Sequence, residues 1–289
     1  IDEREDEVLL EFENGARASA HLVVAADGIH SFVRQKVFGA DKPEYTGFRV
    51  LYSVSSKAFR PKPEQAHIHW KEVDGTGYGF MDTTAGRGAN RHDIVIIIMR
   101  SEEEVTDRWD STLAKEKLAR FAEELAPEHG ILSKAVENSE ICFDWGIYKQ
   151  PIRKTWISPK GRVALLGDAA HATAPFMGQG ANMAMHDGYC LGEILLNDQI
   201  SLKEGLELYE SHRKPYCESV VAKSSMAGRL HTASGFQAML RNKFLSLMLL
   251  RNMRSVVSTD PTTRKPWDRE MTFFQRFGQK MQSICSPKV

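Results

Sequence analysis

The sequence predicts an α/β (α+β) fold in which two buried strands of one unit are separated by an antiparallel β-rich segment and followed by helices. Two apolar runs, "HLVVAADG" at 21–28 and "GRVALLGD" at 161–168, each end in a turn that contains Gly and Asp, as strands of α/β sheets do next to a ligand. Alternating residues in 47–100 predict strands and the apolar spacing in 201–253 predicts helices. The 289 residues, 42% apolar and 26% charged, suit a globular chain of one or two domains.

Charge and cysteine content narrow the function classes. The 38 Lys and Arg residues balance 38 Asp and Glu residues, so no basic surplus favours nucleic acid. The four cysteines, Cys142, Cys190, Cys217 and Cys285, lie far apart without zinc-site spacing, which predicts reduced thiols and a cytoplasmic location. No transmembrane segment is expected, because the longest apolar run, "FLSLMLL" at 244–250, is far shorter than the roughly 20 residues that a span needs. We expect this run in the core, with weak association with a membrane surface as the alternative.

The elements follow in order along the chain. An alternating run at 7–12, a turn at Asn14-Gly15 and an apolar run at 22–26 predict a hairpin whose second strand is buried on both faces. "SFVRQKVFG" predicts a helix that stops at Gly39. Further strands are predicted at 47–56, 66–73, 77–84, 92–100, 139–150 and 162–166. Helices are predicted at 111–125, at about 180–196, and over 201–253 with breaks near Pro215 and Gly235.

The loop "GDAAHATAPFMGQG" at 167–180 carries the most specific chemistry. Asp168 follows a predicted strand, and an ionised carboxylate only accepts hydrogen bonds, so its targets are ligand hydroxyls or a metal, with hydroxyls favoured because no second carboxylate is near. Gly178 and Gly180 let the backbone approach a flat ligand and begin a helix whose free N–H groups face an electron-rich group. Pro175 would form a wall for a planar ring. The alternative is that Asp168 caps a helix and the glycines only form turns.

Two stretches resemble motifs of a known enzyme family. "GRVALLGDAAHATAPFMGQGANMAMHDG" resembles the GD motif, and "VVAADGIHSFVR" resembles the DG motif, of the single-component FAD-dependent aromatic-hydroxylase-like monooxygenases, which include 4-hydroxybenzoate and salicylate hydroxylases. The resemblance covers about residues 5–225. It implies an FAD-binding Rossmann-like domain formed by 1–45 with the DG motif and 151–200 with the GD motif, an inserted antiparallel substrate domain at 46–150, and a C-terminal helical region and tail at 201–289.

The resemblance also implies the residues that bind the cofactor. Asp168 would bind the ribityl hydroxyls of FAD, Pro175 would lie near the reactive face of the isoalloxazine, and the ring's pyrimidine edge would meet the backbone of Gly178, Gln179, Gly180, Ala181 and Asn182. Asp27, Gly28 and Arg34 would belong to a motif linked to FAD and to the pyrophosphate of NAD(P)H. For Asp27 the alternative is a turn or helix cap, and for Arg34 a surface ion pair. His171 is expected to pack or hydrogen-bond rather than to act as an acid or base.

The activity that the resemblance implies is hydroxylation of an aromatic or polyketide-like small molecule. NADPH or NADH would reduce FAD, O₂ would add to form a C4a-hydroperoxyflavin, and one oxygen atom would pass to the substrate, without a metal. Candidate aromatic residues for lining the substrate site are Trp70, Tyr78, Phe80, Trp145 and Tyr148, with Tyr148 a candidate for orienting a phenol. The alternatives are an epoxidase or reductase of the same superfamily, or a truncated non-catalytic remnant.

One family feature is absent from the sequence. Members begin with a βαβ unit whose GxGxxG binds the ADP pyrophosphate, and no such motif follows a strand here, since "GTGYGF" at 75–80 has the wrong spacing. We therefore expect the N-terminal part to be missing, in a fragment, a gene model that starts at an internal exon, or a degenerate paralogue. Without the adenine-end anchor, this chain alone is expected to bind FAD weakly or not at all.

Overall fold

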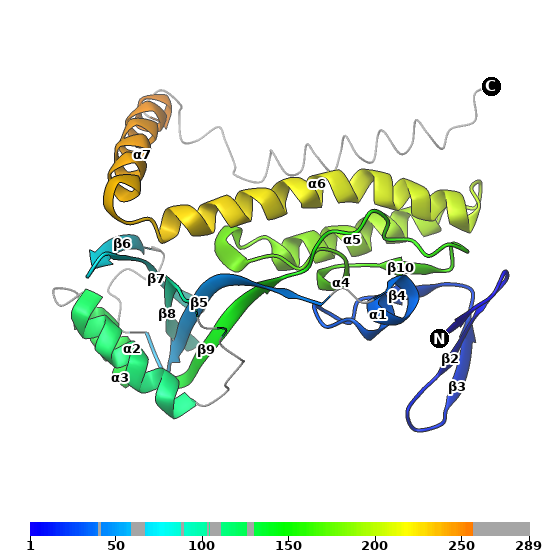
Figure 1. Cartoon of the computed structure of the whole chain (residues 1–289), viewed down its shortest axis with the longest axis horizontal. Helices are drawn as coiled ribbons and strands as arrows, with labels where there is room; N and C mark the ends of the chain where they lie inside the picture. The colour runs from blue at the N-terminus through cyan, green and yellow to red at the C-terminus, as the bar shows by residue number, and fades with distance from the viewer. Residues whose placement is uncertain are drawn as a thin grey trace.

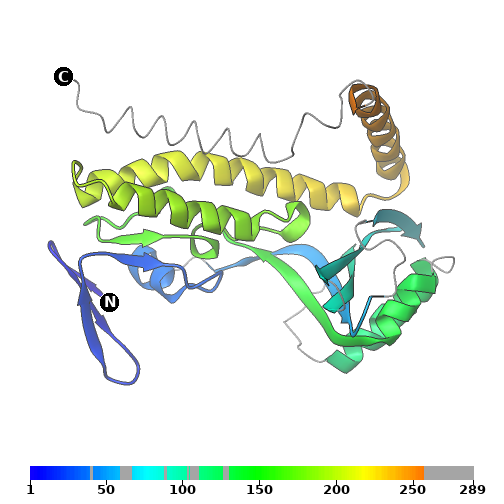
Figure 2. The same ribbon diagram turned by 180° about the vertical axis from the view of Figure 1, so that it is seen from behind.

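The computed structural model describes residues 1–39, 42–58, 67–87, 90–102, 104, 111–125 and 130–256. A five-stranded antiparallel sheet lies at one end and a parallel strand pair at the other, and the long helix α6 (Leu202–His231) runs past both (Figure 1, Figure 2). The mixed α/β class predicted from the sequence is confirmed.

The N-terminal region forms two separate sheets. Strands β1 (Asp2–Glu3), β2 (Val8–Glu11) and β3 (Arg17–Ala20) pair antiparallel, whereas β4 (Val23–Ala25) pairs in parallel with β10 (Val163–Leu165). The predicted hairpin between 7–12 and 22–26 is therefore wrong in its second strand, because Phe12 to Ala16 form the turn and Arg17–Ala20 is the partner. Burial on both faces is also wrong for β4, since Ala25 is buried but Val24 is 39% exposed.

The five-stranded sheet has the order β6-β7-β8-β5-β9. Its strands are β5 (Glu44–Ser55), β6 (His67–Val73), β7 (Thr76–Arg87), β8 (Asn90–Arg100) and β9 (Ser139–Lys149). Helices α2 (Ser111–Leu125) and α3 (Gly130–Glu137) cover one face, where Leu51, Ile97 and Leu118 are buried together. The helix predicted at 111–125 and the antiparallel sheet are confirmed. The rejected "GTGYGF" stretch belongs to the β6–β7 hairpin and the start of β7.

The unit that contains the GD motif is built around β10. After it come α4 (Asp168–His171), the 3₁₀ turn η1 (Pro175–Met177) and α5 (Gly180–Leu195), which packs against α6. Helix α1 (Phe32–Phe38) lies beside β4 (Figure 1). Trp156, Leu165, Met183, Leu206 and Tyr209 form the centre of this core.

The C-terminal helices differ from expectation at one proline. Helix α6 continues through Pro215, because its neighbours Arg213 and Cys217 are held in the buried core on either side, so the predicted break there is wrong. The break before Gly235 is confirmed, and α7 (Gly235–Val256) follows. Among the described residues, no helix combines the length and apolar character that crossing a membrane requires.

Two expectations concern individual side chains. Cys142, Cys190 and Cys217 are free thiols, as predicted, and all three are buried, while Cys285 lies outside the described residues. The run at 244–250 lies in α7, and the expected core position is wrong for Phe244, which is 58% exposed, while the side chains of 247–250 are outside the described part of the structure. The irregular tail predicted from 254 begins too early, because residues 254–256 are the helical end of α7, and residues 257–289 lie outside the described residues.

Candidate functional site

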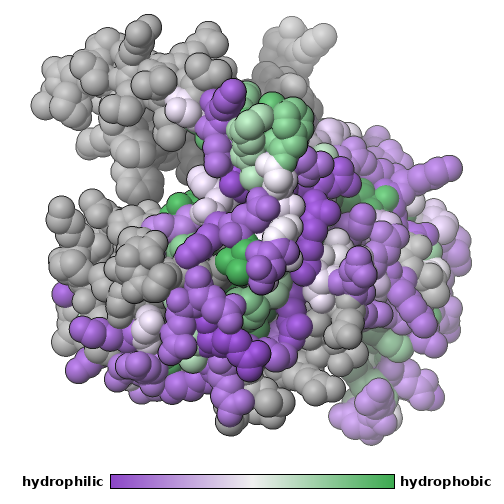
Figure 3. Space-filling model, turned by 60° about the vertical axis from the view of Figure 1, so that its left-hand side comes forward, coloured by the Kyte–Doolittle hydropathy of each residue, from purple (hydrophilic) through white to green (hydrophobic). Residues whose placement is uncertain are grey.

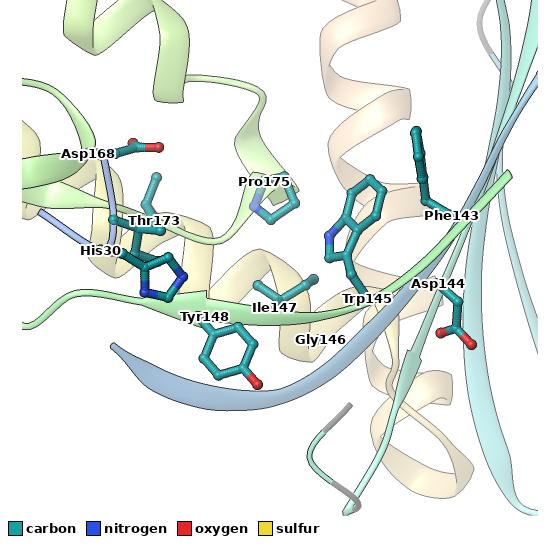
Figure 4. A pocket seen from close by; sticks show the side chains of 11 residues that line it. His30, Phe143, Asp144, Trp145, Gly146, Ile147, Tyr148, Asp168, Thr173 and Pro175 are labelled. Carbon is teal, nitrogen blue, oxygen red and sulfur yellow. The ribbon is translucent and has the colours of Figure 1, made fainter. Parts of the chain in front are cut away.

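A cavity of about 550 Å³ lies between the loop after β10 and strand β9, within the size range of small-molecule sites. Asp168, Thr173 and Pro175 line one side, and Phe143, Trp145 and Ile147 line the other (Figure 4). Ile29 and His30, which follow the DG turn, complete the lining. The structure thus brings the two sequence motifs and the antiparallel sheet together around one cavity.

Asp168 is available to a ligand. Gly167 adopts φ 60 and ψ −139, which turns the chain sharply after β10, and Asp168 then opens the four-residue helix α4. The residue is exposed, and no hydrogen bond joins its carboxylate to another described residue. The helix-cap alternative therefore does not describe Asp168 here, since Gly167 occupies the N-cap position and makes no side-chain bond.

The start of α5 is equally open. Gly178 is left-handed with φ 61 and ends η1, and Gln179 precedes α5 without a side-chain cap. A Cβ atom added at Gly178 or Gly180 would meet no heavy atom within 4 Å, and Ala181 and Asn182 are exposed. The first N–H groups of the helix and the positive end of its dipole therefore face open space.

These residues fit the ring and ribityl half of FAD. Thr173 Oγ1 is buried at the cavity and lacks a hydrogen-bond partner among the described residues, which is costly unless a ligand supplies one. The free Asp168 carboxylate suits sugar-alcohol hydroxyls, and the open helix start suits the carbonyl-rich edge of the isoalloxazine. Pro175 is exposed toward the same space (Figure 4). A cofactor with hydroxyls at one end and an electron-rich ring at the other would satisfy each of these groups.

The DG turn organises the start of α1. Asp27 accepts hydrogen bonds from Ser31 Oγ at 2.5 Å and from the Val33 N–H at 3.1 Å, so the cap that the sequence left open as an alternative is present. Ser31 Oγ in turn accepts from the Arg34 N–H at 2.9 Å. Gly28 has φ 81, a conformation that favours glycine. Whether Asp27 and Gly28 also contact a cofactor stays a prediction.

Arg34 is fully buried, contrary to the surface ion pair considered for it. Its Nη1 donates to the carbonyl of Ala169 at 2.8 Å and its Nη2 donates to the carbonyl of Pro151 at 2.5 Å. The guanidinium therefore joins the DG motif to the backbone directly after Asp168. In this arrangement Arg34 positions the loop, and its predicted link to the pyrophosphate of NAD(P)H stays a prediction.

Beneath the loop lies a buried ionic network. Asp187 Oδ2 accepts from His171 Nε2 at 2.6 Å and from the Gly167 N–H at 3.1 Å, while Asp187 Oδ1 accepts from Arg213 Nε at 2.8 Å. Burial alone would raise the pKa of Asp187, but hydrogen bonds and charges from His171 and Arg213 outweigh it and lower that pKa. His171 thus has the hydrogen-bonding role that the sequence favoured.

This network does not have the character of a metal site. Ligand atoms of His171, Asp187 and Cys217 lie within 4.8 Å of one another, but Arg213 already supplies the positive charge and lies 3.8 Å from Cys217 Sγ. Burial raises the pKa of Cys217 to about 12, so its thiol stays protonated and is a poor ligand. The network instead fixes the backbone of Gly167, one residue before Asp168.

The opposite wall of the cavity is aromatic. On the face of the sheet turned away from α2, Trp145 lies 5.6 Å from Phe143 and 5.9 Å from Tyr52 between ring centroids. Burial raises the pKa of Tyr52, so its hydroxyl stays protonated. Phe48 makes an edge contact with Phe176 of η1 at 5.1 Å, which joins this face to the loop.

Of the five aromatic candidates from the sequence, Trp145 and Tyr148 reach the cavity lining. Tyr148 points away from the face that carries Trp145 (Figure 4), and its hydroxyl donates to Glu104 at 3.0 Å, so the proposed role in orienting a phenol is not supported. Tyr78 and Phe80 pack with the core under α2. Trp70 donates from its indole nitrogen to His231 Nδ1 at 2.9 Å. None of these last three lines the cavity.

Sequence reasoning missed Phe143, His30, Thr173 and Gln150. Phe143 shares the period of two with Trp145 and could have been found from it. Gln150 is 2% exposed, and its Nε2 donates to the carbonyl of Ile29 at 2.7 Å. Its place between the DG turn and β9 has no sequence signal, because it depends on contacts over 121 residues.

Fold and site together define a flavin-binding domain of the oxidoreductase type. The sequence profile described as "FAD binding domain" matches residues 2–224, and the chain belongs to this family. The resemblance to FAD-dependent aromatic hydroxylases is confirmed, because this family model matches and the curated relatives are named as monooxygenases and hydroxylases of aromatic compounds.

Among these relatives, the hispidin-3-hydroxylase of Neonothopanus nambi is 30% identical over 241 residues, covering 76% of this chain and 56% of the relative. The 6-hydroxynicotinate 3-monooxygenase of Bordetella bronchiseptica is 28% identical over 225 residues, covering 74% of this chain and 54% of the relative. The chain therefore spans just over half the length of these curated relatives.

Solved structures share the fold. Klebsiella pneumoniae HpxO, complexed with FAD and uric acid, matches with a TM-score of 0.67 at 22% identity, over 84% of this chain and 59% of that one. The 2,6-dihydroxypyridine-3-hydroxylase of Arthrobacter nicotinovorans matches with a TM-score of 0.65 at 19% identity, over 81% of this chain and 64% of that one.

Proposed function

We propose that this protein acts as an FAD-dependent monooxygenase that uses NADPH or NADH and O₂ to hydroxylate an aromatic or polyketide-like small molecule. The observation that carries this proposal is the two-sided cavity. One side offers the free Asp168 carboxylate, Thr173 Oγ1 and the open start of α5, and the other offers Phe143 and Trp145.

On the cofactor side, Asp168 would hold the ribityl hydroxyls, with Thr173 Oγ1 as a further partner. The N–H groups of Gly180, Ala181 and Asn182 would face the pyrimidine edge of the ring, with Gly178 and Gln179 bordering the same edge. When bound, FAD would supply the redox chemistry and the activation of O₂. Negative charge that develops on the reduced ring would be stabilised by the positive end of the α5 dipole, without reorganisation of the protein.

On the substrate side, the sheet would hold the aromatic ring of the substrate against the face of the isoalloxazine that lies near Pro175. Aromatic side chains pack against planar substrates by offset or edge contacts and exclude water. Phe143 and Trp145 supply such a surface opposite the loop (Figure 4). The names of the relatives include hydroxylases of hydroxybenzoates and hydroxynicotinate, which supports a small aromatic substrate for this protein.

Flavin titration tests the cofactor side without requiring turnover. The described site residues would all meet the ribityl and ring half of the cofactor, so riboflavin and FAD should bind this chain with dissociation constants within about threefold of each other, and weakly. Quenching of flavin fluorescence measures both. Stoichiometric, tight binding of FAD with no binding of riboflavin would contradict this arrangement.

Turnover tests the reaction class. The chain with saturating FAD and NADPH or NADH would be assayed with a panel of phenolic acids and hydroxypyridines for O₂ uptake and for product mass. A product heavier by one oxygen atom supports hydroxylation. A product heavier by two hydrogens would identify a reductase, and flavin binding without turnover of any compound in the panel would contradict these substrate classes for this chain.

A further inference from the structure

Helix α7 exposes a continuous apolar stripe. Phe236, Met239, Leu240 and Phe244 are 69%, 46%, 49% and 58% exposed, and their spacing places them on one side of the helix. Figure 3 brings this end of the molecule forward and shows hydrophobic residues gathered at the top, where α7 stands. Monomeric soluble proteins rarely expose such contiguous apolar surface without an interaction partner.

The other side of α7 is fixed to the body of the protein. Arg241 is 6% exposed, donates from Nη1 to the carbonyl of Leu230 at 2.9 Å, and lies 5.1 Å above the ring of Trp70. Glu72 accepts a hydrogen bond from the Gly235 N–H at 2.7 Å at the start of the helix. The stripe therefore faces outward because the opposite side of the helix is held against β6 and the end of α6.

The same segment is strongly basic. The sequence of α7 contains Arg241, Lys243, Arg251 and Arg254 and no Asp or Glu. Residues 235–289 carry ten Lys and Arg against three Asp and Glu, whereas residues 1–234 carry 28 against 35. The net charge of the whole chain is therefore zero because a positive C-terminal segment balances a negative remainder of the chain.

We propose that the exposed side of α7 binds an anionic membrane surface, with the apolar stripe in the headgroup region and the exposed Lys243 against acidic lipid. Apolar residues beside Lys and Arg on one helix are the pattern of helices that lie in the interface plane. A second copy of this chain is a poorer occupant, because two such helices would bring like charges together, and residues 257–289 carry a net positive charge as well. A nucleic acid would leave the apolar stripe in water.

Vesicle sedimentation of the full 289-residue chain tests this proposal, with vesicles of phosphatidylcholine alone and of phosphatidylcholine with phosphatidylserine. We expect binding to the acidic vesicles, weaker binding to the neutral ones, and a loss of binding when NaCl is raised from about 0.1 M to about 0.5 M. No binding to acidic vesicles at low salt would overturn the proposal. The measurement needs no flavin, so its outcome is independent of the proposed enzymatic function.

Two variants identify the surface. Leu240→Asp with Phe244→Asp should weaken binding at least about tenfold, and Lys243→Glu should weaken it through charge alone. Leu196→Asp is the matched control, because Leu196 is 83% exposed at the end of α5, and it should bind as the unmodified chain does. Equal binding by the double variant and the control, with unchanged circular dichroism, would overturn the proposal. A change from dimer to monomer by light scattering without a change in vesicle binding would show that a second copy covers the stripe.

Discussion

The buried guanidinium of Arg34 donates a 2.8 Å hydrogen bond to the backbone carbonyl of Ala169, which lies 135 residues later in the sequence. This bond joins the DG motif to the residue after Asp168. The two motifs therefore form one structural unit, and the position of the Asp168 carboxylate depends on a side chain that does not itself reach the cavity.

Replacing Arg34 tests this dependence. Arg34→Ala leaves the carbonyls of Ala169 and Pro151 without donors in the core and should lower the free energy of unfolding by about 2–4 kcal/mol. Arg34→Lys should recover only part of this loss, because an ammonium lacks the fork of donors. Urea unfolding measures both, with Arg17→Ala as the control, since the Arg17 side chain is 78% exposed. Equal stability of Arg34→Ala and the control would contradict the positioning role.

Asp168 should affect flavin binding and not folding. Asp168→Asn should weaken riboflavin and FAD binding by about 10- to 100-fold, because hydrogen bonds to a charged acceptor are lost, while the unfolding free energy changes by less than about 0.5 kcal/mol. Asp198→Asn is a matched exposed control in the turn after α5. Unchanged flavin affinity in Asp168→Asn would reject the predicted ribityl contact.

Phe143 distinguishes the two sides of the cavity. Phe143→Ala should raise the KM for an aromatic substrate by about tenfold through lost ring contact, and leave riboflavin affinity unchanged because Phe143 lines the opposite wall. Phe12→Ala is the control, since Phe12 is 52% exposed in the N-terminal sheet region. A parallel loss of flavin affinity would place the ring of the cofactor against the sheet instead.

The buried network should be visible in acid unfolding. The folded-state pKa of Asp187 is lowered, so its ionised form contributes stability above its unfolded pKa of about 4, and this contribution is lost as the pH falls through the folded value. Asp187→Asn should cost about 3–5 kcal/mol at pH 7, because it leaves Arg213 buried without its counterion. It should also flatten the decline in stability below about pH 4. Urea denaturation from neutral pH to about pH 3 checks both, and an unchanged acid slope would show that other carboxylates dominate.

Two helical glycines should respond oppositely to alanine. A Cβ atom at Gly228 of α6 would collide with the ring of Phe176, whereas one at Gly192 of α5 would meet nothing within 4 Å. Gly228→Ala should destabilise by about 1–3 kcal/mol, and Gly192→Ala should stabilise by about 0.4–1 kcal/mol. Thermal unfolding of the two variants under one set of conditions compares them. Stabilisation by Gly228→Ala would mean that α6 and η1 are not in contact.

Local patterns in the sequence predicted much of the fold. The strand at β10, the helices α2 and α5 and the antiparallel sheet all have regular periods of apolar residues, so their types followed from the residues themselves. The errors were of another kind. The partner of β2 was assigned wrongly because the second apolar run, β4, pairs instead with the distant strand β10. The predicted helix break at Pro215 was wrong because core contacts on both sides of the proline outweigh the one hydrogen bond that it removes.

The site residues likewise fall into those that a local sequence pattern reveals and those that depend on distant contacts. Asp168, Pro175, Gly178 and Gly180 could be selected because their chemistry follows from one continuous loop. Phe143 could have been found from Trp145 by the period of two. Gln150 and Tyr52 could not be selected, because Gln150 acts through the Ile29 carbonyl, 121 residues away, and Tyr52 meets Trp145 only through the register of β9 on β5. Arg34 was selected from the motif, but its burial depends on contacts with residues 151 and 169.

Helix α6 has a consequence for how the chain tolerates changes of length. Arg213 on this helix meets Asp187 beneath the loop, and Gly228, four turns on, lies against Phe176. Deleting one residue between them would rotate one contact by about 100° relative to the other and shift it by about 1.5 Å. Both contacts could not then form on one straight helix. The number of residues between Arg213 and Gly228 is therefore fixed by these two contacts. Insertions or deletions in this segment should lower the stability of the fold far more than those in the turn between α5 and α6.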